Sequence, residues 1–369
     1  MEATVSIRTS VERFPEPREM IHHRNLMRMI GVVVKDFPRY MKLMRRRNDY
    51  LAIRNRNELL ELSPDGSGYR CDWKWTSDLH APKLFPFIGR QLYRRAFVNH
   101  PIYFSTAPAV VDQYPEVTFI IGHRGLERLP LLEITLASIA AQRGATIECI
   151  VVEQDSLPQL KGLLPSWVRY FHAPPPQPDL AYNRSMAFNQ GAQLARGNLL
   201  ILHDNDMPVP QDYAAANMAR AREGYEVINL KRFIFYLDQQ TSGNINIAKG
   251  IPPLPGIEAI VQNLQAGGSI AITREAYLDI GGMDESFIGW GGEDNEFWER
   301  AETRKLWPYG SMPILHLWHA PQTGKPSKSS TPTNDRYREL AQIDPKTRIE
   351  SLRQQNAFRN ASMAPELPQ

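Results

Sequence analysis

Two carboxylates separated by a single residue follow a short apolar run near the middle of the chain. Asp204 and Asp206 follow His203 and residues 198–202, a run that predicts a buried strand. Carboxylate oxygens suit a hard divalent cation such as Mg²⁺ or Mn²⁺. Asp and Asn are also common in turns at strand ends, so this pair alone leaves both a metal site and a plain turn as interpretations.

A second acidic cluster opens a predicted helix that runs to about Lys305. Glu293, Asp294 and Glu296 occupy its first turn, behind a glycine-rich segment that contains Trp290. A helix dipole stabilises carboxylates at this position, and that alone could explain the three acids. An acid behind a flexible loop is also how a general base is presented to a substrate hydroxyl. Trp290 has no helical or strand stripe to join, which favours a sugar-stacking platform over a core residue.

Two histidines, His316 and His319, follow a further apolar segment. Their spacing could place both imidazoles on one metal ion, and imidazole completes a mixed nitrogen and oxygen site well. A lone histidine here would more often be structural. The acidic clusters earlier in the chain favour the metal interpretation.

The elements that must position these residues alternate between strand and helix. Such alternation predicts an α/β fold with a mostly parallel sheet, whose ligands bind at the carboxyl ends of the strands. The predicted strands cover 117–121, 147–152 and 198–202, and the predicted helices cover 129–141 and 182–195.

From about Val117 to Pro321 the chain resembles a GT-A fold glycosyltransferase. It is most similar to the β-1,4-galactosyltransferase branch, in its C-terminal region, and to bacterial transferases of the chondroitin-polymerase type (family 2-like). The matching motifs are Tyr182-Asn-Arg-Ser, Asp204-Asn-Asp206, Gly267-Gly268, Gly289-Trp-Gly-Gly-Glu-Asp and His319. The Trp-Gly-Gly-Glu-Asp string is the most specific of these.

The resemblance implies roles for individual residues. It implies Asp294 as the catalytic base, assisted by Glu293, and it implies acceptor binding by Trp290 and Glu293. The implied metal ligands, for Mn²⁺ or Mg²⁺, are Asp206, His319 and His316, the last at a position where galactosyltransferases have methionine. The residues implied to bind the nucleotide sugar are Arg124, Gln154, Tyr182, Arg184, Asp204 and Gly268.

The implied activity is metal-dependent, inverting transfer of a sugar from a UDP-sugar to a hydroxyl of a glycan or lipid-linked acceptor. Two alternatives stay open: a retaining transferase of the N-acetylgalactosaminyl type, and a catalytically silent glycan-binding protein on the same fold. The galactosyltransferase branch has an aromatic pair before its Gly-Gly, where this chain has Gln265-Ala266. That difference leaves an N-acetylhexosamine or glucuronic acid as donor sugars besides galactose.

The domain prediction follows from length and composition. The 369 residues are too many for one ordinary domain, and 42% of them are hydrophobic, as in a globular protein. We expect a basic, mainly helical N-terminal extension over 1–115 and a glycosyltransferase domain over 116–325. A partly flexible tail is expected over 326–369, with one helix near 336–341.

Charge and cysteine content bear on location and partners. Ten Lys or Arg and two acids fall between Met20 and Arg56, interspersed with apolar residues at roughly helical spacing. This pattern indicates either a basic amphipathic helix on an anionic membrane surface or a solvated helix docked on the main domain. No nucleic-acid motif accompanies the charge, so nucleic acid is not an expected partner. Two cysteines and no signal-peptide core at the start favour a bacterial, cytoplasmic enzyme of polysaccharide biosynthesis, either free or peripheral at the inner face of the plasma membrane.

Overall fold

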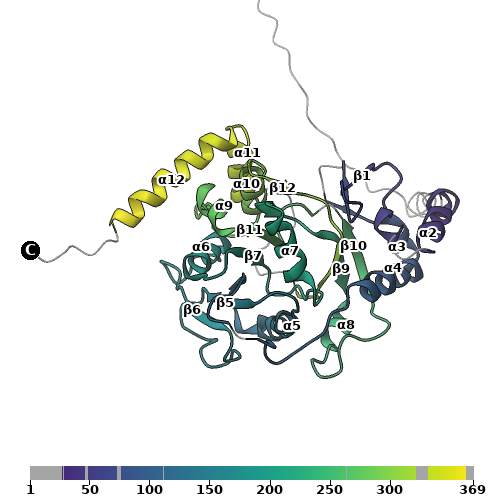
Figure 1. Cartoon of the computed structure of the whole chain (residues 1–369), viewed down its shortest axis with the longest axis horizontal. Coiled ribbons are helices and arrows are strands. Elements are labelled where there is room, and N and C mark those ends of the chain that lie inside the picture. Colours follow the sequence, from purple (N-terminus) through teal and green to yellow (C-terminus); the bar gives the residue numbers. More distant parts are fainter. Residues whose placement is uncertain are drawn as a thin grey trace, which may run out of the picture.

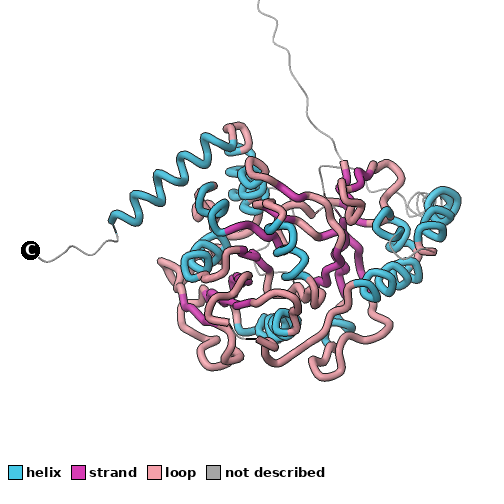
Figure 2. The backbone as a smooth tube through the Cα atoms, viewed as in Figure 1, coloured by secondary structure: helices cyan, strands magenta, loops and turns pink. Residues whose placement is uncertain are grey.

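The computed structural model describes residues 27, 29–45, 49–72, 76–110, 112–262, 264–320 and 331–362 (Figure 1). Strands form the interior and helices lie outside them (Figure 2). Among the described residues, no helix is both long enough and apolar enough to span a membrane.

A seven-stranded sheet forms the centre of the molecule. Its strand order is β12-β8-β11-β7-β4-β5-β6, and only β11 runs antiparallel to its two neighbours. The predicted mostly parallel sheet is therefore confirmed. The strands are β4 (Val117–His123), β5 (Ile147–Glu153), β6 (Arg169–His172), β7 (Leu199–His203), β8 (Val227–Ile228), β11 (Ser269–Thr273) and β12 (Leu306–Trp307). Strands β4 and β5 are covered on both faces, which explains their continuous apolar sequences.

Helices cover both faces of this sheet, and the sheet divides the core between them into two clusters. Helices α5 (Leu129–Ala140) and α7 (Tyr213–Arg222) contribute to one cluster. The opposite face is covered by α6 (Arg184–Leu194), α9 (Arg274–Asp279) and α10 (Glu293–Ala301). Helix α10 ends at Ala301, shortly before the predicted end at about Lys305, and the backbone N–H groups of Thr303 and Arg304 close turns onto the carbonyls of Arg300 and Ala301.

A second, four-stranded sheet has the order β13-β9-β10-β3. Its strands are β3 (Ser77–Asp78), β9 (Lys231–Leu237), β10 (Ile257–Gln262) and β13 (Met312–His316), and the short helix α8 (Gln239–Gly243) follows β9. Strand β13 is parallel to β9, whereas β10 is antiparallel to both β9 and β3. Strand β3 comes from the region predicted to be an N-terminal extension, so that region contributes to the second sheet.

The other described elements before residue 115 pack around the second sheet. Buried side chains of the N-terminal helices share a core with β9, β10 and β13. The region is not purely helical, because β1 and β2 form a separate hairpin. These elements are a π-helical turn (Val32–Asp36), α2 (Phe37–Leu43), a 3₁₀ turn (Asp49–Ala52), β1 (Leu60–Leu62), β2 (Tyr69–Cys71), α3 (His80–Leu84) and α4 (Pro86–Asn99).

The C-terminal region holds two helices, whereas the sequence predicted one near 336–341. Helix α11 covers Pro332–Leu340 and α12 covers Pro345–Ser362 (Figure 1). Each begins with proline, which suits the first helical turn, and the Thr331 side chain caps α11 through the Asn334 N–H. Both helices contact α10, so the acidic N-terminus of α10 belongs to a helix backed by the tail.

Candidate active site and metal centre

The residues after β7 lie beside the segment after β13. The backbone N–H of Leu317 donates to the Asp206 carbonyl at 2.9 Å, and the N–H of Leu315 donates to the Pro208 carbonyl at 3.2 Å. These two bonds bring His316 and His319 to the Asp206 side chain. Chain segments more than a hundred residues apart thereby meet at the carboxyl edge of the sheet, where ligands of open α/β folds bind.

Asp206, His316 and His319 form a group that could hold a metal ion. One donor atom from each lies within 4.8 Å of the others. The His319 Nε2 atom is 3.3 Å from Asp206 Oδ2, and His316 Nε2 is 3.9 Å from Asp206 Oδ1. The His316 ring stacks on Tyr236 with centroids 4.2 Å apart, which fixes its orientation. The structure therefore brings together all three metal ligands predicted from the sequence.

The protonation of this group fits a bound cation. His319 Nδ1 lies 2.9 Å from the Ala320 carbonyl, which can only accept, so Nδ1 carries the proton and Nε2 presents a lone pair. Burial lowers the pKa of His319, which keeps the ring neutral. Among the described residues, Asp206 Oδ1 is buried without a hydrogen-bond partner. A lone pair and a carboxylate that face each other form an arrangement that a divalent ion would bridge.

Arg184 joins the first acidic cluster to the second. Its Nη2 atom donates to Asp204 Oδ1 at 2.6 Å, and its Nη1 atom donates to Asp294 Oδ1. The guanidinium also lies over the Phe188 ring, 4.6 Å from the centroid. Asp294 and Asp204 thus belong to one hydrogen-bonded network. Asp204 is two residues before Asp206, which belongs to the metal group.

Asp294 and Glu293 differ in exposure and in partners. Glu293 is buried, and its Oε2 accepts a hydrogen bond from the Gly291 N–H at 3.0 Å. Burial raises the pKa of Glu293, and the neighbouring Asp294 charge raises it further. About a third of the Asp294 side chain is exposed, at 32%. Burial also raises the pKa of Asp294, while Arg184 opposes that change, so Arg184 favours the carboxylate form that a base requires.

The glycines before β11 leave space for these side chains. Both Gly267 and Gly268 have positive φ angles, of 77° and 71°. A Cβ atom at 267 would lie 2.5 Å from Asp294 Oδ2, whereas one at 268 would meet Met207 and Leu264. Gly267 rather than Gly268 therefore sets the close approach to the Asp294 carboxylate.

Trp290 is a surface residue that is 48% exposed. Its carbonyl accepts a hydrogen bond from the Thr333 hydroxyl at 2.7 Å, so the loop is held by α11. A core role is excluded by this exposure. Its role as a sugar-stacking platform stays a prediction.

The four remaining residues predicted to bind nucleotide sugar lie around the same strand ends. A Cβ atom at Gly122 of β4 would clash with the Tyr182 hydroxyl, so the Tyr182 ring lies against that strand end. Gln154 accepts from the Asn183 N–H at 2.9 Å, and its buried Nε2 has no partner among the described residues. Arg124 instead donates to the Leu180 carbonyl at 2.6 Å. Gly268 accepts from the Asp204 N–H at 2.9 Å.

Two cations of the site were missed from the sequence. Arg128, in a 3₁₀ turn (Leu126–Arg128) after β4, donates from Nη2 to Asp206 Oδ2 at 2.5 Å. Lys231 at the start of β9 is buried and donates to the Ser269 carbonyl. Burial lowers the pKa of Lys231 to about 7, and Asp294 and Asp204 oppose that change. The position of Arg128 after a predicted strand was a usable signal, whereas nothing in the sequence marks Lys231.

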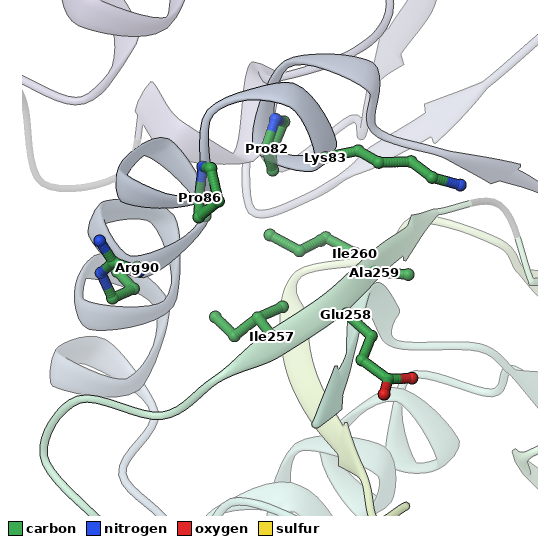
Figure 3. A pocket seen from close by; sticks show the side chains of 9 residues that line it. Pro82, Lys83, Pro86, Arg90, Ile257, Glu258, Ala259 and Ile260 are labelled. Atoms are coloured by element: carbon green, nitrogen blue, oxygen red, sulfur yellow. The ribbon is translucent and has the colours of Figure 1, made fainter. Parts of the chain in front are cut away.

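A small pocket lies elsewhere, between α3, α4 and β10 (Figure 3). It contains none of the predicted site residues. Its lining is Pro82, Lys83, Pro86, Gly89, Arg90 and residues 257–260. This pocket is therefore separate from the strand-end group.

A family sequence model described as the N-terminal domain of galactosyltransferase matches residues 262–307. This segment is similar to a glycosyltransferase domain. It contains Gly267, Gly268, Trp290, Glu293 and Asp294, the residues on which much of the predicted resemblance rests. The match confirms the resemblance and the enzyme class that were predicted from the sequence. A comparison with curated protein sequences gives no match.

Several solved structures are similar to parts of this chain. A structure of GalNAc-T7 with UDP, GalNAc and Mn²⁺ shares 17% identity over 62% of this chain, with a TM-score of 0.44, and the chain spans 49% of that protein. The catalytic domain of Drosophila β1,4-galactosyltransferase 7 with xylobiose shares 15% identity, with a TM-score of 0.34, over 60% of this chain and 79% of that one. The mannosyltransferase PcManGT from Pyrobaculum calidifontis with GDP-Man and Mn²⁺ shares 15% identity, with a TM-score of 0.39, over 77% and 84%.

Proposed function

We propose that this protein is a metal-dependent, inverting glycosyltransferase. It would move a sugar from a UDP-sugar to a hydroxyl of a glycan or lipid-linked acceptor. The observation that carries this proposal is the Arg184 bridge, which ties the candidate base Asp294 to Asp204 beside the metal group. A single displacement needs a base on one side of the anomeric carbon to deprotonate the acceptor hydroxyl. It also needs a group on the opposite side that stabilises the leaving diphosphate. A network that contains both a base and a metal group supports this mechanism.

Asp206, His319 and His316 would hold Mn²⁺ or Mg²⁺, whose oxygen and imidazole preferences the group satisfies. The bound ion would act as a Lewis acid on the diphosphate of the donor. Arg184 and Asp204 would position the nucleotide beside it, together with Arg124, Gln154, Tyr182 and Gly268.

Asp294 would act as the general base. Its Oδ1 is engaged by Arg184, which leaves Oδ2 for an acceptor hydroxyl. Removal of the hydroxyl proton allows the oxygen to attack the anomeric carbon on the face opposite the diphosphate. A single displacement of this kind inverts the anomeric configuration. Trp290 would stack on the acceptor sugar and Glu293 would bind it.

The product of the reaction tests this proposal. We expect wild-type protein, supplied with an α-linked UDP-sugar and an acceptor, to give a β-linked product by NMR. Asp294→Asn should reduce kcat by about 10²- to 10⁴-fold, the usual contribution of a general base. An α-linked product would favour the retaining alternative, and wild-type turnover by the Asp294→Asn variant would exclude Asp294 as the base.

We also propose that the protein acts in the cytoplasm, at the inner face of an anionic membrane. In the described part of residues 20–56, one helical face is buried and the other is apolar and exposed. The exposed apolar residues are Met27, Met29, Ile30, Val33, Val34 and Met41. Lys35, Lys42 and Arg45 are exposed beside them, a combination that suits an interfacial helix on anionic lipid.

Vesicle binding tests the membrane proposal. The double variant Ile30→Ser, Val34→Ser should lose co-sedimentation with vesicles that contain phosphatidylserine. Leu278→Ser, at an exposed leucine elsewhere on the surface, serves as the matched control and should still co-sediment. Equal binding by the wild type and the double variant would contradict the proposal.

A further inference from the structure

Arg128 places a permanent positive charge beside Asp206, the carboxylate of the candidate metal group. Its Nη2 atom lies 2.5 Å from Asp206 Oδ2 and 3.3 Å from Asn205 Oδ1. Only 12% of the Arg128 side chain and 6% of the Asp206 side chain are exposed, so solvent screens this pair little. A guanidinium stays protonated under all ordinary conditions, so pH does not remove the charge.

The Oδ2 atom of Asp206 faces both Arg128 and His319, whereas Oδ1 faces His316. His319 Nε2 lies 3.3 Å from Asp206 Oδ2, the atom to which Arg128 donates. A divalent ion held between Asp206 and His319 would therefore share its carboxylate with a guanidinium. A divalent cation and the guanidinium would repel each other when both contact one carboxylate, and the arginine already offsets much of the negative charge of that ligand.

Arg128 also has a donor that the chain leaves unused. Its Nε atom is buried and has no hydrogen-bond partner among the described residues. A buried donor without an acceptor is costly, and an anion that enters the site would satisfy it. The diphosphate of a nucleotide donor would be such an anion, and arginine suits phosphate oxygens well.

We propose that Arg128 makes metal binding depend on the nucleotide. Without a nucleoside diphosphate, the guanidinium pairs with Asp206 and lowers the affinity of the site for the divalent ion. With the diphosphate present, its negative charge offsets the repulsion and accepts hydrogen bonds from Arg128, so metal and nucleotide bind cooperatively. This inference rests on the proposed metal-dependent transferase and adds a positioning residue that regulates its metal site.

Calorimetric titration with Mn²⁺, with and without UDP, tests the inference. We expect Arg128→Gln to bind Mn²⁺ in the absence of UDP at least tenfold more tightly than wild type. We expect UDP to tighten Mn²⁺ binding strongly in wild type. In Arg128→Gln, the change in log Kd for Mn²⁺ caused by UDP should be less than half of the change in wild type. By linkage, Mn²⁺ should improve UDP binding by the same factor within each protein. Arg128→Lys keeps the charge and should resemble wild type.

The alternative role for Arg128 is purely structural, as the residue that orients Asp206. In that case Arg128→Gln would bind Mn²⁺ more weakly than wild type, or equally, and our inference would be overturned. Arg338→Gln, at an exposed surface arginine, is the control for loss of one positive charge. If wild type binds no Mn²⁺ even with UDP, the proposed metal-dependent function fails, a result distinct from failure of the Arg128 inference.

Discussion

The guanidinium of Arg184 donates a hydrogen bond to the carboxylate of Asp294, a residue 110 positions away in the sequence. The same guanidinium donates to Asp204, at the end of a central strand. One arginine thereby fixes the distance between the candidate base on α10 and the strand end that carries the metal group. Its charge also favours the ionised form of Asp294 against the effect of burial.

Loss of this arginine should shift the pH dependence of turnover. Arg184 lowers the pKa of Asp294, so Arg184→Gln should raise that pKa and leave more of the base protonated at a given pH. The acidic limb of the kcat profile should therefore move to higher pH. Arg184→Lys, which keeps a positive charge, should move it less. An acidic limb at the same pH in wild type and Arg184→Gln would contradict this role.

Gly267 should be intolerant of a side chain for a reason separate from backbone strain. Its φ angle of 77° alone would cost Gly267→Ala about 1–2 kcal/mol of folding stability. The added Cβ would also lie 2.5 Å from Asp294 Oδ2 and displace the base, so kcat should fall at least about tenfold.

Gly66 offers the matched control for Gly267. It has a similar φ angle of 73°, and a Cβ added there would have no neighbouring atom within 4 Å. Gly66→Ala should therefore show the stability loss in thermal unfolding but keep wild-type kcat. Equal kcat values for Gly267→Ala and Gly66→Ala would show that Gly267 does not set the position of Asp294.

Helix α11 should hold the loop of residues 289–292, which contains the proposed acceptor-binding Trp290, in place. The Thr333 hydroxyl donates to the Trp290 carbonyl, and Cβ atoms added at Gly291 and Gly292 would clash with α11. Thr333→Val removes the hydrogen bond with little change in volume. We expect faster hydrogen exchange over 289–292 and a KM for the acceptor raised several-fold, with the KM for the donor unchanged. Unchanged exchange in this loop would show that α11 does not restrain it.

A buried ion pair should make a large contribution to the integrity of α10. Arg300 and Glu296 are both almost fully buried, and Arg300 also donates to the carbonyls of Ile280 and Gly282. Arg300→Ala would leave Glu296 with Arg348 as its remaining cation and should lower the free energy of unfolding by about 3 kcal/mol. Arg338→Ala, which breaks an exposed pair with Asp335, should cost at most about 1 kcal/mol in the same denaturant titration.

The elements around the site could be predicted because their sequences carry strong periodic signals. The continuous apolar run of β4 and the apolar helix α5 both lie close to their predicted bounds. The end of α10 and the helix α12 were not predicted. The end of α10 is a backbone turn at residues 302–304, and α12 packs on α10 through Arg348, which pairs with Glu296 and Glu299.

The residues of the candidate site also divide into those that could be predicted from the sequence and those that could not. Asp206 and His319 could be predicted together because the resemblance to GT-A transferases implied both as metal ligands, and carboxylate and imidazole both suit a divalent ion. The position of Arg128 after a predicted strand was a usable signal, whereas Lys231 could not be predicted, because a buried cation gains its role from the acids that the fold places beside it. Long-range hydrogen bonds, such as that from Leu317 to Asp206, decide which residues meet, and these leave no trace in local sequence.

Thermal unfolding with a panel of nucleotide sugars, with and without Mn²⁺, tests the central claim most directly. A ligand that binds only the folded state, at a concentration of about 100 times its Kd, adds about 2.7 kcal/mol of stability. The assay detects binding and not turnover, so it needs no acceptor. We predict that Tm rises with one UDP-sugar only when Mn²⁺ is present, and that Asp206→Ala abolishes the rise. No rise with any nucleotide sugar, or a full rise in Asp206→Ala, would contradict a metal-dependent nucleotide-sugar site at Asp206.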